Sequence, residues 1–183
     1  MARILFIIGS LRKDSFNRQL ASEIMSMIAG RAECVVLDYA DVPFLNQDAE
    51  YPAPASVTRL RDTVAAADAL WIVTPEYNAS YPGLLKNVLD WLSRPVVRND
   101  YATPTAMRGK KATISGAAGN SAAGHARKKL AELLGFMGAD LFKDEGNGVA
   151  LSGESFGSDT LVVTEDAKKN LQSQVDGFLA FIG

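Results

Sequence analysis

Short, uninterrupted apolar runs alternate along this chain with longer segments whose apolar residues recur every three or four positions. Four of the runs have the length of a strand: RILFII (3–8), CVVLDY (34–39), ALWIVT (69–74) and KATISG (111–116). They are continuous rather than alternating in polarity, as expected when both faces of a parallel sheet are covered. A fifth, weaker run is ADLFKD (139–144). The pattern predicts a parallel sheet of five buried strands.

The segments between these runs have the periodicity of amphipathic helices. The apolar residues that share a helical face fall into five sets: Leu20, Ile24, Met27 and Ile28; Val57, Leu60, Val64 and Ala67; Leu85, Val88, Leu89 and Leu92; Ala126, Leu130, Leu133 and Met137; and Leu171, Val175, Phe178 and Ile182. Thr164 is the expected N-cap of the last helix. Strict alternation of strand and helix predicts a three-layer α/β fold with right-handed crossovers. At 183 residues, we expect one domain, residues 1–183.

Two segments lack helical or strand periodicity. Residues 43–56 contain three prolines and are expected to form a surface connection, and residues 144–163 are rich in Gly and Ser and are expected to form a long loop or a lid. We expect Trp71 to lie in the core, whereas Trp91 fits either the core or, preferably, a dimer surface. Cys34 is expected to be packed and inert.

Charge and composition exclude several classes of partner. The net charge of -2 provides no basic face for nucleic acid and no polybasic run for an anionic membrane. No apolar run approaches the ~20 residues that span a bilayer. Cys34 is the only cysteine, so neither a disulfide framework nor a thiolate metal site is expected, and no other metal-ligand spacing is present. With no export signal in view, we expect a cytoplasmic location.

The segment GSLRKDSFNR (9–18) follows the first predicted strand and has the composition of an anion-binding loop. It places the short polar side chains of Ser10, Ser15 and Asn17 and the fork-shaped donor of Arg12 at the start of a helix, where partial positive charge favours an anion. The dinucleotide pattern G-x-G-x-x-G and the Walker pattern are both missing, so a monophosphate fits better. The alternative is an ordinary helix start, with Ser15 as N-cap and solvated basic residues beside it.

The segment TPEYNASYPGLLKNVLDWLSRP (74–95) follows the third predicted strand. Pro75 ends the strand, and the backbone N–H groups of Glu76, Tyr77 and Asn78 could meet the edge of a planar heteroaromatic ring, with Tyr77 near its face. The alternative is a turn that leads into an amphipathic helix.

Together, GSLRKDSFNRQLA and TPEYNASYPGLLKNVLDWLSRP resemble the two signature segments of the NADPH-dependent FMN reductase family, over roughly residues 3–135. That family has a flavodoxin-like fold and includes bacterial quinone, chromate and azo-dye reductases. The resemblance implies the strand order 2-1-3-4-5. It also implies a homodimer or homotetramer, packed partly through the helix that contains Lys86 to Trp91.

The resemblance implies an FMN site made of ten residues. Those that would hold the phosphate and ribityl chain are Ser10, Arg12, Ser15, Phe16 and Asn17, those that would line the isoalloxazine ring are Pro75, Glu76, Tyr77 and Asn78, and Ser115 would approach its pyrimidine side. The implied function is FMN-dependent NAD(P)H oxidoreduction by ping-pong hydride transfer to quinones, flavins or similar small acceptors. Because bound FMN carries this chemistry, no catalytic side chain is expected.

Two other functions compete with this interpretation. A flavodoxin-like FMN electron carrier or sensor would have no NAD(P)H turnover of its own, but carriers that dock on basic partners are strongly acidic, and this chain is not. GESFG (153–157) matches the nucleophile pattern of serine hydrolases. However, we expect Ser155 in a loop, and the only histidine, His125, precedes it instead of following it. A hydrolase is therefore not expected, and His125 is expected to be a surface or capping residue.

Overall fold

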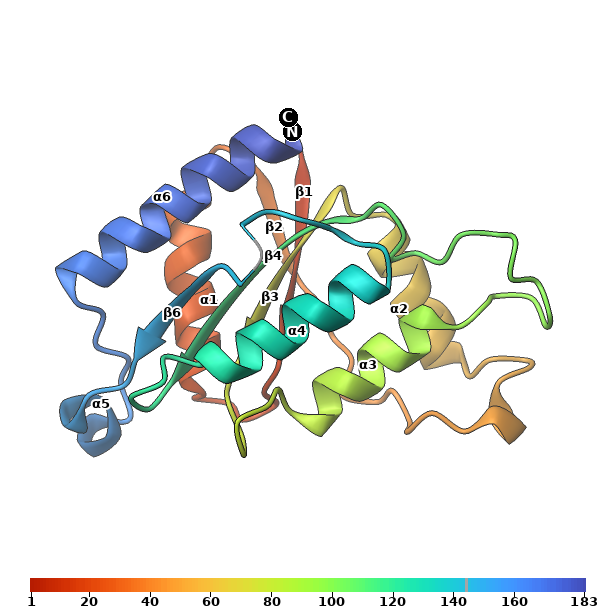
Figure 1. Ribbon diagram of the computed structural model, residues 1–183, viewed down its shortest axis with the longest axis horizontal. Helices are drawn as coiled ribbons and strands as arrows, with labels where there is room; N and C mark the ends of the chain where they lie inside the picture. The colour runs from red at the N-terminus through yellow and green to blue at the C-terminus, as the bar shows by residue number, and fades with distance from the viewer. Residues whose placement is uncertain (144) are drawn as a thin grey trace.

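The computed structural model describes residues 1–143 and 145–183 (Figure 1). The elements follow in the order β1 (Arg3–Ile8), α1 (Phe16–Ile28), β2 (Glu33–Val36), the 3-10 turn η1 (Gln47–Ala49), α2 (Ala55–Ala65), β3 (Ala69–Thr74), α3 (Gly83–Ser93), β4 (Lys111–Ala118), α4 (Gly124–Phe136), β5 (Asp140–Leu141), β6 (Asn147–Ala150), α5 (Gly153–Ser158) and α6 (Glu165–Ile182). The predicted strands at 3–8 and 69–74 are confirmed at their boundaries, and β4 runs two residues further than predicted.

The sheet is parallel, with strand order β2-β1-β3-β4-β5, and β6 also pairs with β4. The order is therefore the predicted 2-1-3-4-5 of the flavodoxin-like fold. The register places Ile4 opposite Cys34 on one side and opposite Ala69 on the other, and Trp71 opposite Thr113. Because the strands are parallel, their carboxyl ends meet at one edge of the sheet, where ligands bind in open α/β sheets.

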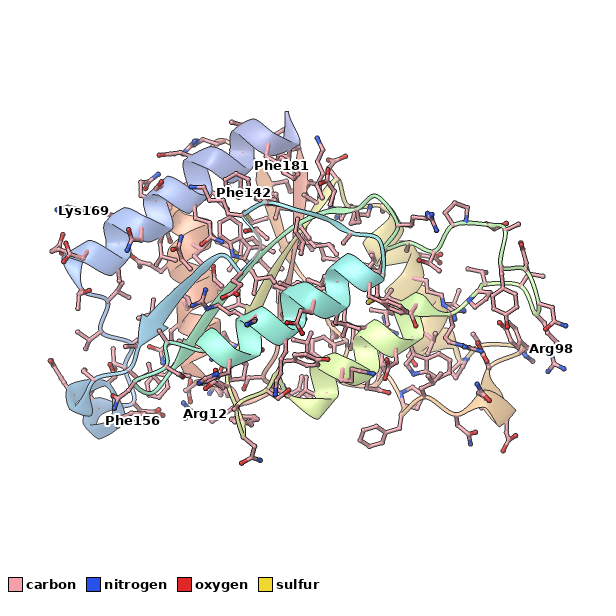
Figure 2. All side chains as sticks on the ribbon, in the orientation of Figure 1. Arg12, Arg98, Phe142, Phe156, Lys169 and Phe181 are labelled. Atoms are coloured by element: carbon pink, nitrogen blue, oxygen red, sulfur yellow. The ribbon has the colours of Figure 1, made fainter. Side chains whose placement is uncertain are left out.

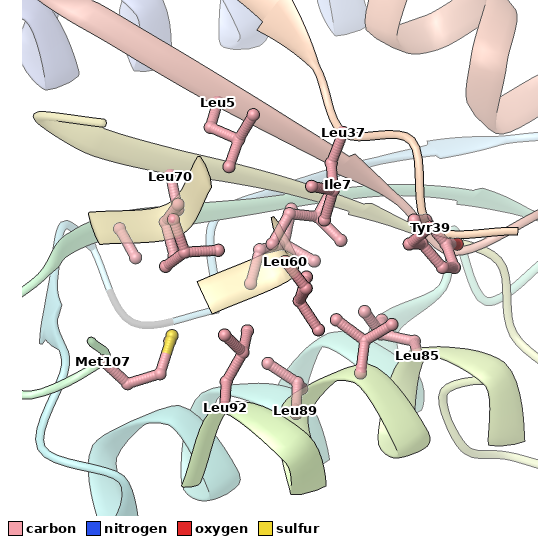
Figure 3. Packing of buried hydrophobic residues seen from close by; sticks show 14 of the residues in the cluster. Leu5, Ile7, Leu37, Tyr39, Leu60, Leu70, Leu85, Leu89, Leu92 and Met107 are labelled. Atoms are coloured by element: carbon pink, nitrogen blue, oxygen red, sulfur yellow. The ribbon is translucent and has the colours of Figure 1, made fainter. Parts of the chain in front are cut away.

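Helices cover both faces of the sheet (Figure 1). Alternate residues of β1 and β3 point to opposite sides: Leu5 and Leu70 pack with α2, α3 and α4, whereas Ile4 and Trp71 pack with α1 and α6. Figure 3 shows the first of these two cores, where leucines of α3 and Met107 lie beneath the strands. The three-layer architecture and the core position of Trp71 are thus confirmed.

The prediction of a fully buried second strand is wrong. β2 spans only four residues and lies at the sheet margin, where Cys34 is half-buried. Continuous apolar sequence indicates coverage of both faces but does not distinguish a central strand from a marginal one.

The other margin of the sheet is divided, and here too the sequence prediction is corrected. The expected strand at 139–144 contains only the two residues of β5, its last position lying outside the described residues, and the expected loop at 144–163 contains strand β6 and helix α5. The carbonyl of Ile114 on β4 lies between the position that pairs with Leu141 of β5 and the position that pairs with Asn147 of β6. The side-chain amide of Gln174, fully buried on α6, donates to that carbonyl at 2.8 Å.

Gly146, directly before β6, and Gly148, within it, allow close packing, although the sequence interpretation took this Gly-rich segment for a loop. A Cβ at Gly146 would lie 1.8 Å from the Ile114 carbonyl oxygen, and one at Gly148 would lie 1.9 Å from the Ala122 carbonyl oxygen. No larger residue fits at either position without moving the backbone.

Two expectations about single residues have opposite outcomes. Thr164 is the N-cap of α6, as predicted, and its hydroxyl accepts a hydrogen bond from the Ala167 N–H. Trp91 is not at a surface: it is fully buried on α3, and its indole N–H donates to the Pro43 carbonyl at 2.8 Å. The connection at 43–56 covers it, so Trp91 cannot form a dimer surface.

Candidate functional site

A cleft of about 240 Å³ lies at the carboxyl ends of β1, β3 and β4. The residues that line it are Ser10, Arg12, Ser15, Phe16, Asn17, Pro75, Glu76, Tyr77, Ala117, Ala118, Gly119, Leu151 and Phe156. Eight of the ten residues predicted from the sequence are among them, and Asn78 and Ser115 are not. In Figure 2, Arg12 and Phe156 mark this end of the molecule, opposite the chain termini of Figure 1.

The loop after β1 is packed tightly against the neighbouring strand. The Gly9 N–H donates to the Val73 carbonyl at 2.7 Å, and a Cβ at Gly9 would lie 3.1 Å from the Pro75 ring. Ser15 is the N-cap of α1, and its hydroxyl accepts from the Arg18 N–H at 3.0 Å. The first backbone N–H groups of a helix have no partner within it, so those of Phe16 and Asn17 can serve an anion.

Asn17 is a clamp between α1 and β4. Its side chain is only 3% exposed, its amide nitrogen donates to the Ala117 carbonyl at 2.9 Å, and its amide oxygen accepts from the Ala117 N–H at 2.8 Å. Both ends of the amide are therefore engaged with the strand end that lines the cleft. Asn17 is therefore a positioning residue that holds the end of β4 against α1. Its own backbone N–H belongs to the first turn of α1.

Arg12 is paired with a carboxylate from a distant segment. Its two terminal nitrogens donate to the two oxygens of Asp159, at 2.8 and 2.9 Å. These hydrogen bonds hold the pKa of Asp159 below its ordinary value. The guanidinium also lies 5.5 Å from the ring centre of Phe16, which in turn meets Phe156 edge-on. The segment around α5 therefore forms one wall of the cleft.

The loop after β3 is fastened by Glu76. Its carboxylate accepts from the Ala126 N–H at 2.9 Å, at the start of α4. That helix needs an external cap, because its N-cap residue, Ala123, has no side-chain acceptor to offer. Burial raises the pKa of Glu76, but the hydrogen bonds from Ala126 and Ser121 and the nearby His125 outweigh it, so the net pKa is lowered.

The tip of this loop is a tight turn. The Tyr77 N–H donates to the Ser80 carbonyl at 2.9 Å, and the Ser80 N–H donates back at 3.1 Å. Asn78 and Ala79 form the turn in the left-handed region, with φ of 52° and 54°. The expectation of three free N–H groups here needs correction, because that of Tyr77 is already used, and Asn78 lies outside the cleft lining. The Tyr77 side chain is 56% exposed at the cleft mouth.

Ser115, which the resemblance places near the pyrimidine side of FMN, does not line the cleft. Ser115 is fully buried; its hydroxyl accepts from the Trp71 indole N–H at 3.1 Å and lies 3.1 Å from the Gln174 amide oxygen. Because β4 continues to Ala118, the strand end that reaches the cleft consists of Ala117, Ala118 and Gly119. Glycine and alanine have low strand propensity, so no local signal in the sequence marked this longer strand. Nor did one mark Leu151 and Phe156 as lining residues.

The serine of GESFG is structural. Ser155 lies within α5, not in a loop, and is fully buried; its hydroxyl accepts from the Val162 N–H at 3.1 Å and lies 3.2 Å from that of Ser152. His125 is exposed on α4. In residues 1–143 and 145–183, no three His, Cys, Asp or Glu side chains gather as metal ligands would. Nor is any described helix long and apolar enough for a membrane crossing.

Comparisons with known proteins agree with this geometry. The profile of the NADPH-dependent FMN reductase family matches residues 2–145. A 2-hydroxy-1,4-benzoquinone reductase of Burkholderia sp is 33% identical over 181 residues, which cover 98% of this chain and 96% of that protein. A quinone reductase of Pseudomonas putida is 34% identical over 156 residues, covering 78% and 82%.

A solved structure shares the whole architecture. FerB, a flavoenzyme NAD(P)H:(acceptor) oxidoreductase from Paracoccus denitrificans, is 34% identical with a TM-score of 0.86, covering 100% of this chain and 97% of its own. An NADH:FMN oxidoreductase in its apo form, 24% identical with a TM-score of 0.71, shares the fold. The chain belongs to the NADPH-dependent FMN reductase family.

Proposed function

We propose that the cleft binds FMN with its phosphate at the start of α1 and its ring between the loop after β3 and the end of β4. The protein is an FMN-dependent NAD(P)H oxidoreductase that reduces quinones, flavins or similar small acceptors. The observation that carries the proposal is the division of the cleft into a donor-rich end and an apolar end.

The residues present fit both parts of FMN. At the donor-rich end, the hydroxyls of Ser10 and Ser15, the unpaired N–H groups of the first helical turn and the guanidinium of Arg12 suit a phosphate. At the other end, the lining residues that suit an aromatic ring are Pro75, Tyr77, Ala117, Ala118 and Leu151.

Bound FMN supplies the hydride chemistry. The chain's own contribution is binding and orientation: Asn17 fixes the strand end beside the helix start, and Glu76 fixes the ring-side loop to α4. The exposed mouth at Tyr77 leaves room for NAD(P)H and for the acceptor. We assign no side chain as nucleophile, acid or base.

We further propose a homodimer or homotetramer in the cytoplasm. Large apolar side chains are exposed away from the cleft; Tyr101 and Phe136, at 75% and 90% exposure, line one hollow beside the carboxyl end of α3. Burying them would favour self-association. The single cysteine, Cys34, favours a reducing compartment.

The test is a visible absorption spectrum of the purified protein after incubation with FMN, followed by NADPH and NADH oxidation with a quinone as the only acceptor. We expect bound flavin and turnover by the protein alone. A flavin spectrum with no NAD(P)H oxidation until a separate reductase is added would identify an electron carrier instead. Failure to bind FMN at micromolar concentration would refute the proposed function.

A further inference from the structure

Asp159 makes with Arg12 the contact that a phosphate would make. Arginine presents two parallel N–H donors to a carboxylate or to a phosphate in the same way. In this chain both donors are directed at Asp159, with distances of 2.8 and 2.9 Å and with both side chains about half exposed. The donor-rich end of the cleft therefore contains an internal anion at its only arginine.

The backbone of Asp159 is held without help from Arg12. The side-chain amide of Gln19 on α1 donates to the Asp159 carbonyl at 3.0 Å, and its oxygen accepts from the Leu161 N–H at 2.7 Å. Nearby, Phe156 packs edge-on against Phe16. The carboxylate can therefore turn away from Arg12 while the segment that carries it stays in place.

Asp159 occupies the face of the guanidinium that Nη1 and Nη2 form, and that face can make its two parallel hydrogen bonds with only one anion at a time. A second anion elsewhere on the same guanidinium would be repelled by the first. A flavin phosphate that pairs with this face of Arg12 must therefore displace Asp159.

We propose that Asp159 is an affinity-determining residue for the flavin, acting as a placeholder that returns Arg12 to a paired state whenever the phosphate leaves. The inference rests on the proposed function, because it takes Arg12 as a phosphate ligand. Release of FMN then does not leave a bare guanidinium in the cleft, so the cost of release falls. The same exchange lowers the advantage of FMN over riboflavin. The chain is thereby built to exchange its flavin rather than to retain it.

The decisive variant is Asp159→Asn. Asn has nearly the same size, carries no charge and tolerates the left-handed backbone found at this position, where φ is 53°. Asp14→Asn is the matched control. Asp14 lies in the same loop as Arg12 and contributes to its electrostatic environment, but Arg12 makes its described side-chain hydrogen bonds to Asp159. Both variants change the net charge equally.

The experiment measures FMN and riboflavin binding to the flavin-free forms of the wild type and both variants, by quenching of flavin fluorescence at physiological ionic strength. Stopped-flow displacement gives the release rates. For Asp159→Asn we expect FMN to bind about three- to tenfold more tightly and to leave correspondingly more slowly, with riboflavin affinity unchanged. For Asp14→Asn we expect changes within about twofold for both ligands, because salt screens a charge that is not in contact.

The outcomes separate this inference from the proposed function. Equal or weaker FMN binding by Asp159→Asn would overturn the placeholder role and show that Asp159 orients Arg12 instead. Equal tightening in Asp14→Asn would overturn it in favour of a general charge effect. Absence of FMN binding in all three proteins would refute the proposed function and the inference together, whereas tighter FMN binding without NAD(P)H turnover would refute only the proposed function.

Discussion

The loops after β1 and after β3 line the same cleft but are held by different kinds of contact. The first is bonded to the sheet at two points, since the Gly9 N–H donates to Val73 of β3 and the Asn17 side chain is bonded to Ala117 of β4. The second is fixed by one carboxylate, Glu76, and its tip is a self-contained turn with an exposed tyrosine. The firmly held loop after β1 suits a phosphate, which needs donors in fixed positions. The loop after β3, held at fewer points, suits a flavin ring face that NAD(P)H and the acceptor must reach in turn.

If Asn17→Ala has little effect on stability, the loop after β1 is not held more firmly than the loop after β3. The substitution leaves the buried N–H and carbonyl of Ala117 without partners, so we expect the free energy of unfolding to fall by about 2–4 kcal/mol. Urea unfolding followed by circular dichroism measures it. A loss below about 0.5 kcal/mol would mean that water replaces the amide easily and that the loop after β1 is not firmly held.

Arg12→Ala tests the donor-rich end directly. We expect FMN affinity to fall by about 10- to 100-fold, because a charge-assisted pair with the phosphate is lost. Riboflavin, which has no phosphate, should bind as before. Arg12→Lys is the control: it keeps the charge without the fork, and its FMN affinity should lie between the two, as fluorescence titration would show. An unchanged FMN affinity in Arg12→Ala would refute the phosphate assignment.

Glu76→Gln tests the ring-side fastening through its pH dependence. Because the pKa of Glu76 is lowered in the folded protein, its charge stabilises the fold above its ordinary pKa of about 4.3, and the contribution is lost as the pH falls through the lowered value. We expect the free energy of unfolding of the wild type to exceed that of the variant by about 1 kcal/mol at pH 7, and the difference to disappear as the pH falls below the lowered pKa of Glu76. Thermal unfolding across this range measures it, and a difference independent of pH would show that the charge is not what fastens the loop.

The smallest expected effect is at the turn itself and has the opposite sign. Ala79 adopts a left-handed backbone in an exposed turn, so Ala79→Gly should raise the free energy of unfolding by about 0.5 kcal/mol. Asn78→Gly is the control and should be close to neutral, since Asn tolerates this region. Destabilisation by Ala79→Gly would show that the tip is under tighter constraint than its contacts indicate.

Local sequence signals predicted the parts of the fold that rest on local physics. Continuous apolar runs marked β1, β3 and most of β4, and helical periodicity marked the helices that cover them. The strand order came from the resemblance to a family. The positions of β2 and β5 at the sheet margins were missed because an apolar run does not show whether a further strand lies beside it. β6 was missed because its segment, rich in Gly and Ser, was expected to form a loop or a lid.

The candidate site was predictable in its residue types but not in their partners. Polar residues after two strand ends pointed to the cleft, because parallel strands bring their carboxyl ends together. The contacts that set each residue's role join positions far apart in the chain: Asn17 and Ala117 are separated by 100 residues, Glu76 and Ala126 by 50, and Arg12 and Asp159 by 147. No local pattern encodes such pairings, so the roles of Asn17, Glu76 and Asp159 can be recognised only from the three-dimensional structure.

The interruption between β5 and β6 also bears on how copies of this protein behave when crowded. A long, continuous sheet margin is a template on which strands of other molecules can add, and short margins blunt that hazard. At one margin, β5 has two residues and β6 has four, and the Ile114 carbonyl between them already accepts from the Gln174 side-chain amide. The opposite margin is β2, which has four residues. Within the described residues, neither margin presents a long run of consecutive backbone groups to an incoming strand, so we expect little strand addition to the native state.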